Sequence, residues 1–357
     1  VKSEPEALFP ASFPEVVAQG YRPEFRSSYW LPKVTRDDQG YVFGVYSYRS
    51  DRLDRQRLIF SPTYGFKSKN WGYSGDVLQR FGLFTAGLSL EDRVVRRTYL
   101  SNSYYERTRS NDFRLEYPFS LSTSLSMGAN LTHRGIAKTP DQVGLPVPSV
   151  GRDHSLYFQI RRRSIRNEPL WEIFPRRGRE LSATYRKGLE WLDGELKYDS
   201  MSVRWNEFVP VDRYLVGMAR FWFAEDNKAD GVRRPEDLSL GGSDYLRGYK
   251  GAVRFGDSLR YVGLHLARPF EFQWNAVRKW IQKEILVAEV FYERGDVRSA
   301  ERSFSYLEDV GVELRGRGLI LRRLPVTVRM GWAKPRGGGP THSYWTIDYS
   351  TVSSLIR

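Results

Sequence analysis

The segment Gly241-Gly242-Ser243-Asp244-Tyr245-Leu246-Arg247-Gly248-Tyr249 places an arginine beside a glycine, between aromatic residues and after paired glycines. Such a segment can fold back onto the protein, because Gly248 adopts backbone angles closed to other residues and permits a close approach. Tyr245 and Tyr249 can wedge the segment with their rings and hydrogen-bond through their hydroxyls. The chemistry indicated is electrostatic: a partly desolvated Arg247 needs a carboxylate partner, ideally as a bidentate fork.

Two glutamates in a later predicted strand are candidates for that partner. Glu289 and Glu293 share one face of this strand, about 13 Å apart at the usual rise per residue. The opposite face carries Leu286, Ala288, Val290 and Tyr292. Glu293 lies nearer the C-terminal end of this strand, which we expect to be its external end, and is the preferred partner. The alternative is an exposed hairpin tip with a solvated arginine, because Gly-Gly-Ser-Asp is ordinary turn chemistry.

The sequence holds no arrangement typical of an enzyme, a metal site or a bound cofactor. It has no cysteine, and its four histidines fall in no metal-ligand spacing. No Ser-His-Asp grouping or suitably spaced carboxylate pair stands out. The glycine run after Arg336 is not a phosphate loop, because no helix follows it. We therefore predict a protein that is not an enzyme and uses no cofactor.

Composition points to a transmembrane β-barrel. The 357-residue chain has a mean hydropathy of −0.53 and 15% aromatic residues. No run approaches the roughly 18 apolar residues of a membrane helix, whereas barrel strands need only about 9–11 alternating residues. Girdles of tyrosine and tryptophan at the membrane interfaces would explain the aromatic excess. The net charge of +14 is spread over many short segments without a recognition helix, so we expect no nucleic-acid partner.

Alternating segments separated by turn residues predict a barrel over residues 41–351. In 121–131, for example, Leu121, Leu125 and Leu131 share one face and serines share the other. A soluble β-sandwich would show the same period, with its apolar face in a core. The sixteen expected strands, an even number as such barrels require, are 41–50, 55–66, 71–79, 83–91, 96–106, 112–119, 122–134, 153–163, 178–187, 194–206, 214–226, 257–268, 284–294, 308–317, 323–333 and 343–351.

Three segments lie outside this strand pattern. The proline-rich residues 1–40 predict an irregular periplasmic lead-in or strap, and residues 352–357 a C-terminal tail. Apolar residues in 270–283 recur at helical spacing and include Trp274 and Trp280. This segment predicts an amphipathic helix at the periplasmic membrane surface, or a helix packed on another protein surface. No signal peptide opens the chain at Val1, so we expect a mature protein or the C-terminal part of a longer one.

The chain resembles the BamA-like superfamily of outer-membrane β-barrels, which includes the two-partner-secretion transporters and is also known as the bacterial surface antigen family. That superfamily carries an Arg-Gly-aromatic motif in its sixth extracellular loop, between strands eleven and twelve, where Leu246-Arg247-Gly248-Tyr249 falls in this count. Its aromatic-acid-x-Gly motif on strand thirteen is matched by Tyr292-Glu293-Arg294-Gly295, and its Pro-x-x-Gly element by Pro175-Arg176-Arg177-Gly178. The resemblance implies a loop that folds inward, with Gly241 and Gly242 leading into it, and an Arg247–Glu293 pair that latches it. The lead-in Tyr29-Trp30-Leu31-Pro32 resembles members with a periplasmic β-propeller or another soluble module ahead of the barrel.

Two functions follow from the resemblance: protein translocation or assembly at the bacterial outer membrane, or a plugged barrel that anchors a periplasmic module or complex. The chain has no recognisable POTRA domains, and Tyr349 is followed by eight residues rather than ending the chain. Both departures speak against the general assembly machine. Expected partners are outer-membrane lipid and lipopolysaccharide, whose phosphates suit the basic residues, and periplasmic domains or proteins. A solvated basic surface is the alternative to specific lipid binding.

Overall fold

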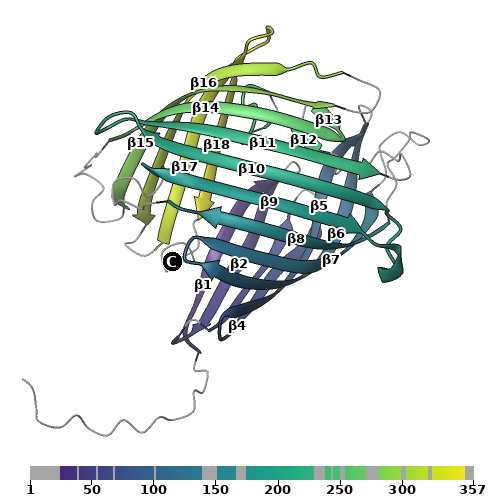
Figure 1. The fold of residues 1–357 in the computed structure, drawn as a ribbon. Helices are drawn as coiled ribbons and strands as arrows, with labels where there is room; N and C mark the ends of the chain where they lie inside the picture. Colours follow the sequence, from purple (N-terminus) through teal and green to yellow (C-terminus); the bar gives the residue numbers. More distant parts are fainter. Residues whose placement is uncertain are drawn as a thin grey trace, which may run out of the picture.

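The structure is a computed structural model that describes residues 25–37, 40–53, 55–66, 69–99, 102–138, 151–165, 174–228, 238–242, 244–249, 254–270, 281–298, 303–320 and 324–349. Sixteen of its strands form one antiparallel sheet in which each strand pairs with the next along the chain. The sheet curls into a barrel (Figure 1). In chain order its strands are β1 (Phe25–Asp37), β2 (Gly40–Asp51), β3 (Gln56–Gly65), β4 (Asn70–Phe81), β5 (Phe84–Tyr99), β6 (Asn102–Ser120), β7 (Thr123–Lys138), β8 (Arg152–Arg163), β9 (Gly178–Gly188), β10 (Tyr198–Pro210), β11 (Val216–Lys228), β14 (Ser258–Phe270), β15 (Ile281–Arg298), β16 (Leu307–Ile320), β17 (Leu324–Pro335) and β18 (His342–Tyr349).

The longest connection lies at one end of the barrel, although both ends have connections of two residues and residues 164–177 link β8 to β9 at the opposite end. At that opposite end, residues 82–83 join β4 to β5, and residues 121–122 join β6 to β7. At the other end, residues 229–257 join β11 to β14 and contain a separate two-stranded sheet of β12 (Leu238–Leu240) and β13 (Arg254–Gly256). Outer-membrane barrels have short periplasmic turns and longer extracellular loops. The β11–β14 connection is therefore the sixth extracellular loop.

The barrel wall is apolar outside and polar inside. On β14, Val262, Leu264 and Leu266 are 36%, 51% and 37% exposed, whereas Tyr261, His265 and Ala267 on the opposite face are buried. Buried polar residues recur on other strands, such as Glu106 on β6 and Ser155 on β8. Water-soluble β-proteins bury their apolar face instead, so this alternation is that of a wall with lipid outside. Among the described residues, the structure contains no helix long and apolar enough to span a membrane.

The predicted count of sixteen strands is confirmed, although two individual predictions are wrong. Residues 25–37 form β1, so the barrel begins inside the predicted 1–40 lead-in. Pro32, which suggested an irregular segment, lies in β1, the first strand of the sheet order. One edge of β1 has no partner strand among the described residues, so that edge needs no backbone N–H donor and tolerates proline. The predicted strand 96–106 covers the end of β5 and the beginning of β6, and 112–119 is part of β6. One missed strand and one extra strand cancel, which leaves the numbering of later strands unchanged.

The other predicted end segments are only partly within the described residues. Residues 271–280, with Trp274 and Trp280, lie outside them, as do residues 1–24 and the predicted tail 352–357. The ends of the predicted helix 270–283 are wrong, because Phe270 ends β14 and Ile281 begins β15. Strands β14 and β15 therefore extend into both ends of the segment that was predicted to be a helix.

The inverted polarity of the wall predicts a position-dependent cost of added charge. Leu264→Arg places a guanidinium at the middle of the lipid-facing surface of β14 and should lower the free energy of unfolding in lipid vesicles by about 2–4 kcal/mol. Thr184→Arg, at mid-height on the lumenal face of β9, is the matched control and should cost far less. Urea titrations of both variants in vesicles measure the difference. Equal costs would contradict a lipid-facing exterior.

Candidate functional site

The sixth extracellular loop folds into the barrel and is anchored there by apolar packing. Leu240 and Leu246 from the loop are buried against residues of the barrel wall. Tyr245 lies between two aromatic rings, 4.8 Å from the centroid of Trp222 and 5.0 Å from that of Tyr261. The remaining buried members of this cluster are Ala224, Leu259 and Val297. The packing fixes the loop so that the residue after Leu246 enters the lumen.

Backbone geometry explains the residue types at the tip of the loop. Gly241 and Gly242 have φ angles of +125° and +106°, which side chains rarely permit. Leu246 also lies in the left-handed region at φ +52°, a strained conformation that its burial compensates. A Cβ atom on Gly248 would lie 2.8 Å from the Cβ of Asp309, so only glycine allows its amide to donate to Asp309 Oδ2 at 2.6 Å.

Arg247 is 1% exposed and uses its whole guanidinium group. Its Nε donates to Glu293 Oε1 at 3.2 Å, Nη1 to Glu313 Oε2 at 2.8 Å and Nη2 to Glu289 Oε1 at 3.0 Å. Its backbone amide donates to Glu293 Oε2 at 3.0 Å. The guanidinium carbon lies 3.4 Å from the centroid of the Phe291 ring, a cation–π contact in a desolvated setting. Desolvation alone would lower the pKa of Arg247, but Glu293 and Glu289 outweigh it and raise the pKa.

The carboxylates form two directly opposed pairs across β15 and β16. Glu289 faces Glu313, and Glu293 faces Asp309 in the strand register. Like charges in these positions repel each other, and all four residues are at most 3% exposed. A buried carboxylate requires a cation or several donors. Arg247 meets three of the four directly, and its neighbour Gly248 donates to the fourth.

Two wall arginines and one tyrosine complete the cluster, which we call the Arg247 network. Arg329 on β17 donates to Glu313 Oε2 at 3.1 Å and to Asp244 of the loop at 3.0 Å. Arg315 donates to Glu313 Oε1 at 2.8 Å. Tyr344 on β18 donates to Glu313 Oε2 at 2.6 Å. With His265 on β14, whose Nδ1 lies 2.7 Å from Glu289 Oε1, the network contacts five consecutive strands.

Glu293, the preferred candidate partner, and Glu289, the other candidate, both contact Arg247. Glu313, Asp309 and Tyr344 were not predicted. Asp309 and Glu313 repeat the i, i+4 spacing of Glu289 and Glu293 on the next strand, and that signal could have found them. Tyr344 is 97 residues from Arg247, and no local pattern indicates their contact.

The remaining predicted motif residues have packing roles in two places. Gly295 faces Tyr261, and a Cβ there would lie 2.8 Å from Leu240 Cδ1, so it makes room for the loop. Gly178, at φ +125°, begins β9 at the periplasmic end, where a Cβ would overlap the carbonyl of Ser164. Pro175 follows Phe174, which is buried against Phe208 with ring centroids 5.8 Å apart. The Pro-x-x-Gly element therefore packs on the periplasmic side of the Arg247 site, against Ala267 and Val287, which lie two residues along their strands from His265 and Glu289.

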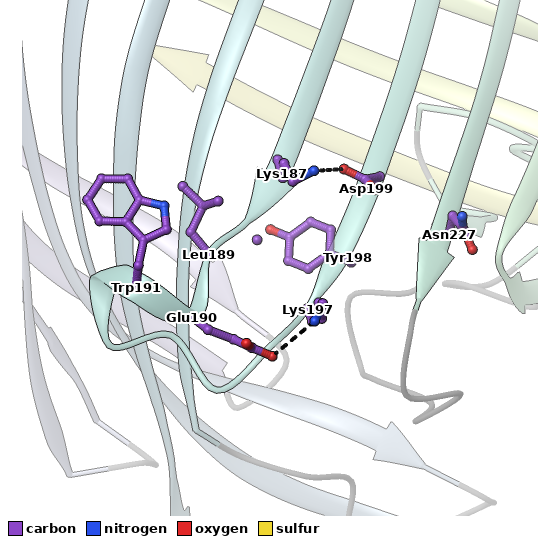
Figure 2. Close-up of a pocket in the computed structure, with 9 residues that line it drawn as sticks. Lys187, Leu189, Glu190, Trp191, Lys197, Tyr198, Asp199 and Asn227 are labelled. Carbon is purple, nitrogen blue, oxygen red and sulfur yellow. Dashed lines mark ion pairs between the residues drawn. The ribbon is translucent and has the colours of Figure 1, made fainter.

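A surface pocket of about 350 Å³ beside the β9–β10 hairpin offers no comparable chemistry (Figure 2). Its lysines are paired, Lys187 with Asp199 at 3.5 Å and Lys197 with Glu190 at 3.6 Å. These pairs are exposed and contribute little to stability.

Removal of the central cation should destabilise the barrel strongly. Arg247→Gln leaves several buried carboxylates without their shared partner, and we expect a loss of about 3–5 kcal/mol in unfolding free energy. Arg336→Gln, which breaks a 3.3 Å pair between an exposed arginine and Glu308, is the control and should cost less than about 1 kcal/mol. Urea midpoints and heat-modifiable gel migration measure both. Wild-type behaviour of Arg247→Gln and Glu293→Gln would contradict a bracing role for the loop.

Gly331 should be intolerant of a side chain because of Tyr344. The two residues face each other across β17 and β18, and a Cβ on Gly331 would overlap the Tyr344 ring. Gly331→Ala should lower the urea midpoint, because the added methyl group displaces the Tyr344 ring from Glu313. In a Tyr344→Ala background the ring is absent, so Gly331→Ala should lower the midpoint little further than Tyr344→Ala alone. Gly316→Ala, whose Cβ would meet only Leu286 at 3.6 Å, is the control. If the losses of Gly331→Ala and Tyr344→Ala in urea midpoint simply add in the double variant, this steric coupling is ruled out.

No protein-family model and no curated protein matches the sequence. Among solved structures, BamA of Haemophilus ducreyi lacking POTRA domains 1–3 is similar with a TM-score of 0.65 and 13% identity, over 92% of this chain and 71% of that one. CdiB from Escherichia coli has a TM-score of 0.64 and 13% identity, over 89% of this chain and 61% of that one. CdiB from Acinetobacter baumannii has a TM-score of 0.57 and 14% identity, over 90% and 59%.

The chain thus spans about three fifths of the CdiB structures. At these identities the likeness is one of fold. The chain has the fold of the BamA-like outer-membrane barrels: a sixteen-stranded antiparallel transmembrane β-barrel whose sixth extracellular loop is folded inward.

Proposed function

We propose that this chain is the barrel of a protein translocation or assembly system in the bacterial outer membrane, and that the Arg247 network is the latch that braces it. The fold shared with BamA and CdiB supports the general role. The observation that carries the proposal is the extent of the network, which reaches from β14 to β18, the last strand of the sheet. The latch stabilises the wall on one side of the seam between β18 and β1.

Backbone pairing alone holds β18 weakly. The strand has eight residues, whereas its neighbour β17 has twelve, and its ladder runs to β17. Within the described residues no ladder joins β18 to β1. Side chains supply the missing support: the Tyr344 hydroxyl bonds Glu313, and His342 Nδ1 lies 3.0 Å from the Arg247 carbonyl oxygen. The seam can then open to a client strand while β14–β18 keep their shape.

A structural anchor for a periplasmic module or complex is the second candidate. Lumenal packing at the periplasmic end favours it, because Phe174, Phe208, Val216, Ala267 and Val287 form a buried cluster there. Together with the inward loop, this cluster places buried side chains in the lumen at two heights, on the same side of the barrel. A static plug would serve an anchor, and a client-handling barrel would move at least one of the two.

Site-specific photo-cross-linking in the native host separates the two candidates. A photoreactive residue replaces Trp345 on β18, which is 56% exposed beside the seam, and in a second strain replaces Leu264 on β14, which is 51% exposed in the middle of the wall. A translocation or assembly barrel should give adducts with newly made polypeptides at position 345 during pulse labelling, and these should disappear during the chase. Position 264 should give none.

An anchor would give the same stable partners throughout the chase, or no protein adducts at position 345. Equal adducts at both positions would also contradict a seam that handles clients. Folding of both variants is checked by heat-modifiable migration, so that loss of adducts is not loss of the barrel.

A further inference from the structure

A row of polar and basic side chains crosses five neighbouring strands of the barrel at one height. The register places Tyr73 of β4 opposite Asp92 of β5, Asp92 opposite Arg109 of β6, Arg109 opposite His133 of β7, and His133 opposite Arg152 of β8. Arg107 lies two residues along β6 from Arg109, on the same face. We call Arg107, Arg109 and His133, together with Asp92 opposite Arg109, the outer basic row.

The outer basic row faces away from the lumen. Its members alternate along their strands with inward residues such as Glu106 and Thr108, which are 0% and 5% exposed. They share a face with the outward apolar residues Phe113 and Leu115 on the same strand, which are 48% and 40% exposed. Charged side chains on this face meet the membrane or its border.

The row lies towards the extracellular end of β6, where outer-leaflet headgroups would border the wall. Along β6 towards the periplasm, the outward face continues from Arg109 to Phe113 and Leu115, and then to the short 121–122 turn. In the other direction, β6 begins at the extracellular end. Tyr73 and Trp71 on β4, 43% and 67% exposed, flank the row as aromatic residues do at membrane interfaces.

Asp92 arranges the two arginines as a pair. Arg107 forks onto the carboxylate with Nε and Nη2, each at 2.8 Å, and Arg109 donates from Nε at 3.2 Å. The Asp92 side chain is 5% exposed, whereas those of Arg107 and Arg109 remain 39% and 57% exposed. One carboxylate against two guanidiniums leaves a net positive charge that is held in place and accessible from outside.

We propose that the outer basic row binds the phosphate groups of a glycolipid of the outer leaflet, of the lipid A class. The guanidiniums would hold the phosphate oxygens by charge-assisted hydrogen bonds, which suit planar, forked recognition. Acyl chains would cover the apolar surface directly below, at Phe113, Leu115 and Met127. This site is separate from the Arg247 network and rests only on the placement of the barrel in an outer membrane.

Binding of purified lipid A to the detergent-solubilised full chain tests the proposal. The double variant Arg107→Gln, Arg109→Gln should weaken binding of bisphosphorylated lipid A about tenfold or more, since it removes two charged donors. The matched control is Arg161→Gln, Arg163→Gln on β8, which makes the same charge change at the same spacing on the lumenal face. It should bind as the wild type does. Native mass spectrometry measures bound lipid over a concentration series.

Three further arms identify the ligand. Enzymatically dephosphorylated lipid A should bind the wild type as weakly as the double variant binds lipid A. Inorganic phosphate and vesicles of phosphatidylglycerol should not compete at matched phosphate concentration. Equal binding of phosphorylated and dephosphorylated lipid, equal loss in the lumenal control, or full competition by inorganic phosphate would each overturn the proposal. If the double variant does not fold, Arg109→Gln alone, at the more exposed arginine, should still weaken binding measurably, and unchanged binding would overturn the proposal.

The outcome is distinguishable from that of the proposed function. In a folded double variant, the photo-cross-links at position 345 should persist, because the Arg247 network is intact. Loss of lipid A binding with retained cross-links supports the glycolipid site alone, whereas retained lipid binding without cross-links contradicts only the translocation role.

Discussion

The burial of one guanidinium among opposed carboxylates is the interaction that joins the sixth loop to strands β14–β18. Glu289 and Glu293 of β15 face Glu313 and Asp309 of β16 across a single ladder, so the sheet by itself places like charges in contact. Arg247, which the inward-folded loop carries into the lumen, offsets this repulsion by pairing with three of the carboxylates. The cost of desolvating these groups is offset only while all of them are present. Wall and loop therefore stabilise each other.

Glycines on the lumenal face make this arrangement sterically possible. Gly295 and Gly311 lie in β15 and β16 where side chains would collide with Leu240 and Phe291, and Gly331 leaves space for Tyr344. The rings of Phe291 and Tyr344 occupy the space that side chains at Gly311 and Gly331 would need. On the lipid-facing side of the same strands, the only requirement is that the residues be apolar. Inward and outward faces thus follow independent rules within one strand.

Much of the fold could be predicted from alternation alone, because each strand must satisfy water on one face and lipid on the other. The first strand escaped prediction since Pro32 breaks the pattern at an edge where the sheet tolerates it. Glu293 and Glu289 could be predicted as partners of Arg247 because they share a face at fixed spacing. Glu313 requires knowledge of the register between β15 and β16. Tyr344 requires the curvature of the barrel, which no short segment encodes.

Contacts of Arg247 are ordered along the chain in a way that bears on folding kinetics. Its partners lie 18, 42, 46, 66 and 97 residues further on. Loop closure becomes slower and entropically costlier as such separations grow. The guanidinium can be fully satisfied only after the last strand has reached the wall. Completion of the cluster is thus a late step, and a chain truncated before β18 would keep a partly unsatisfied charge in its interior.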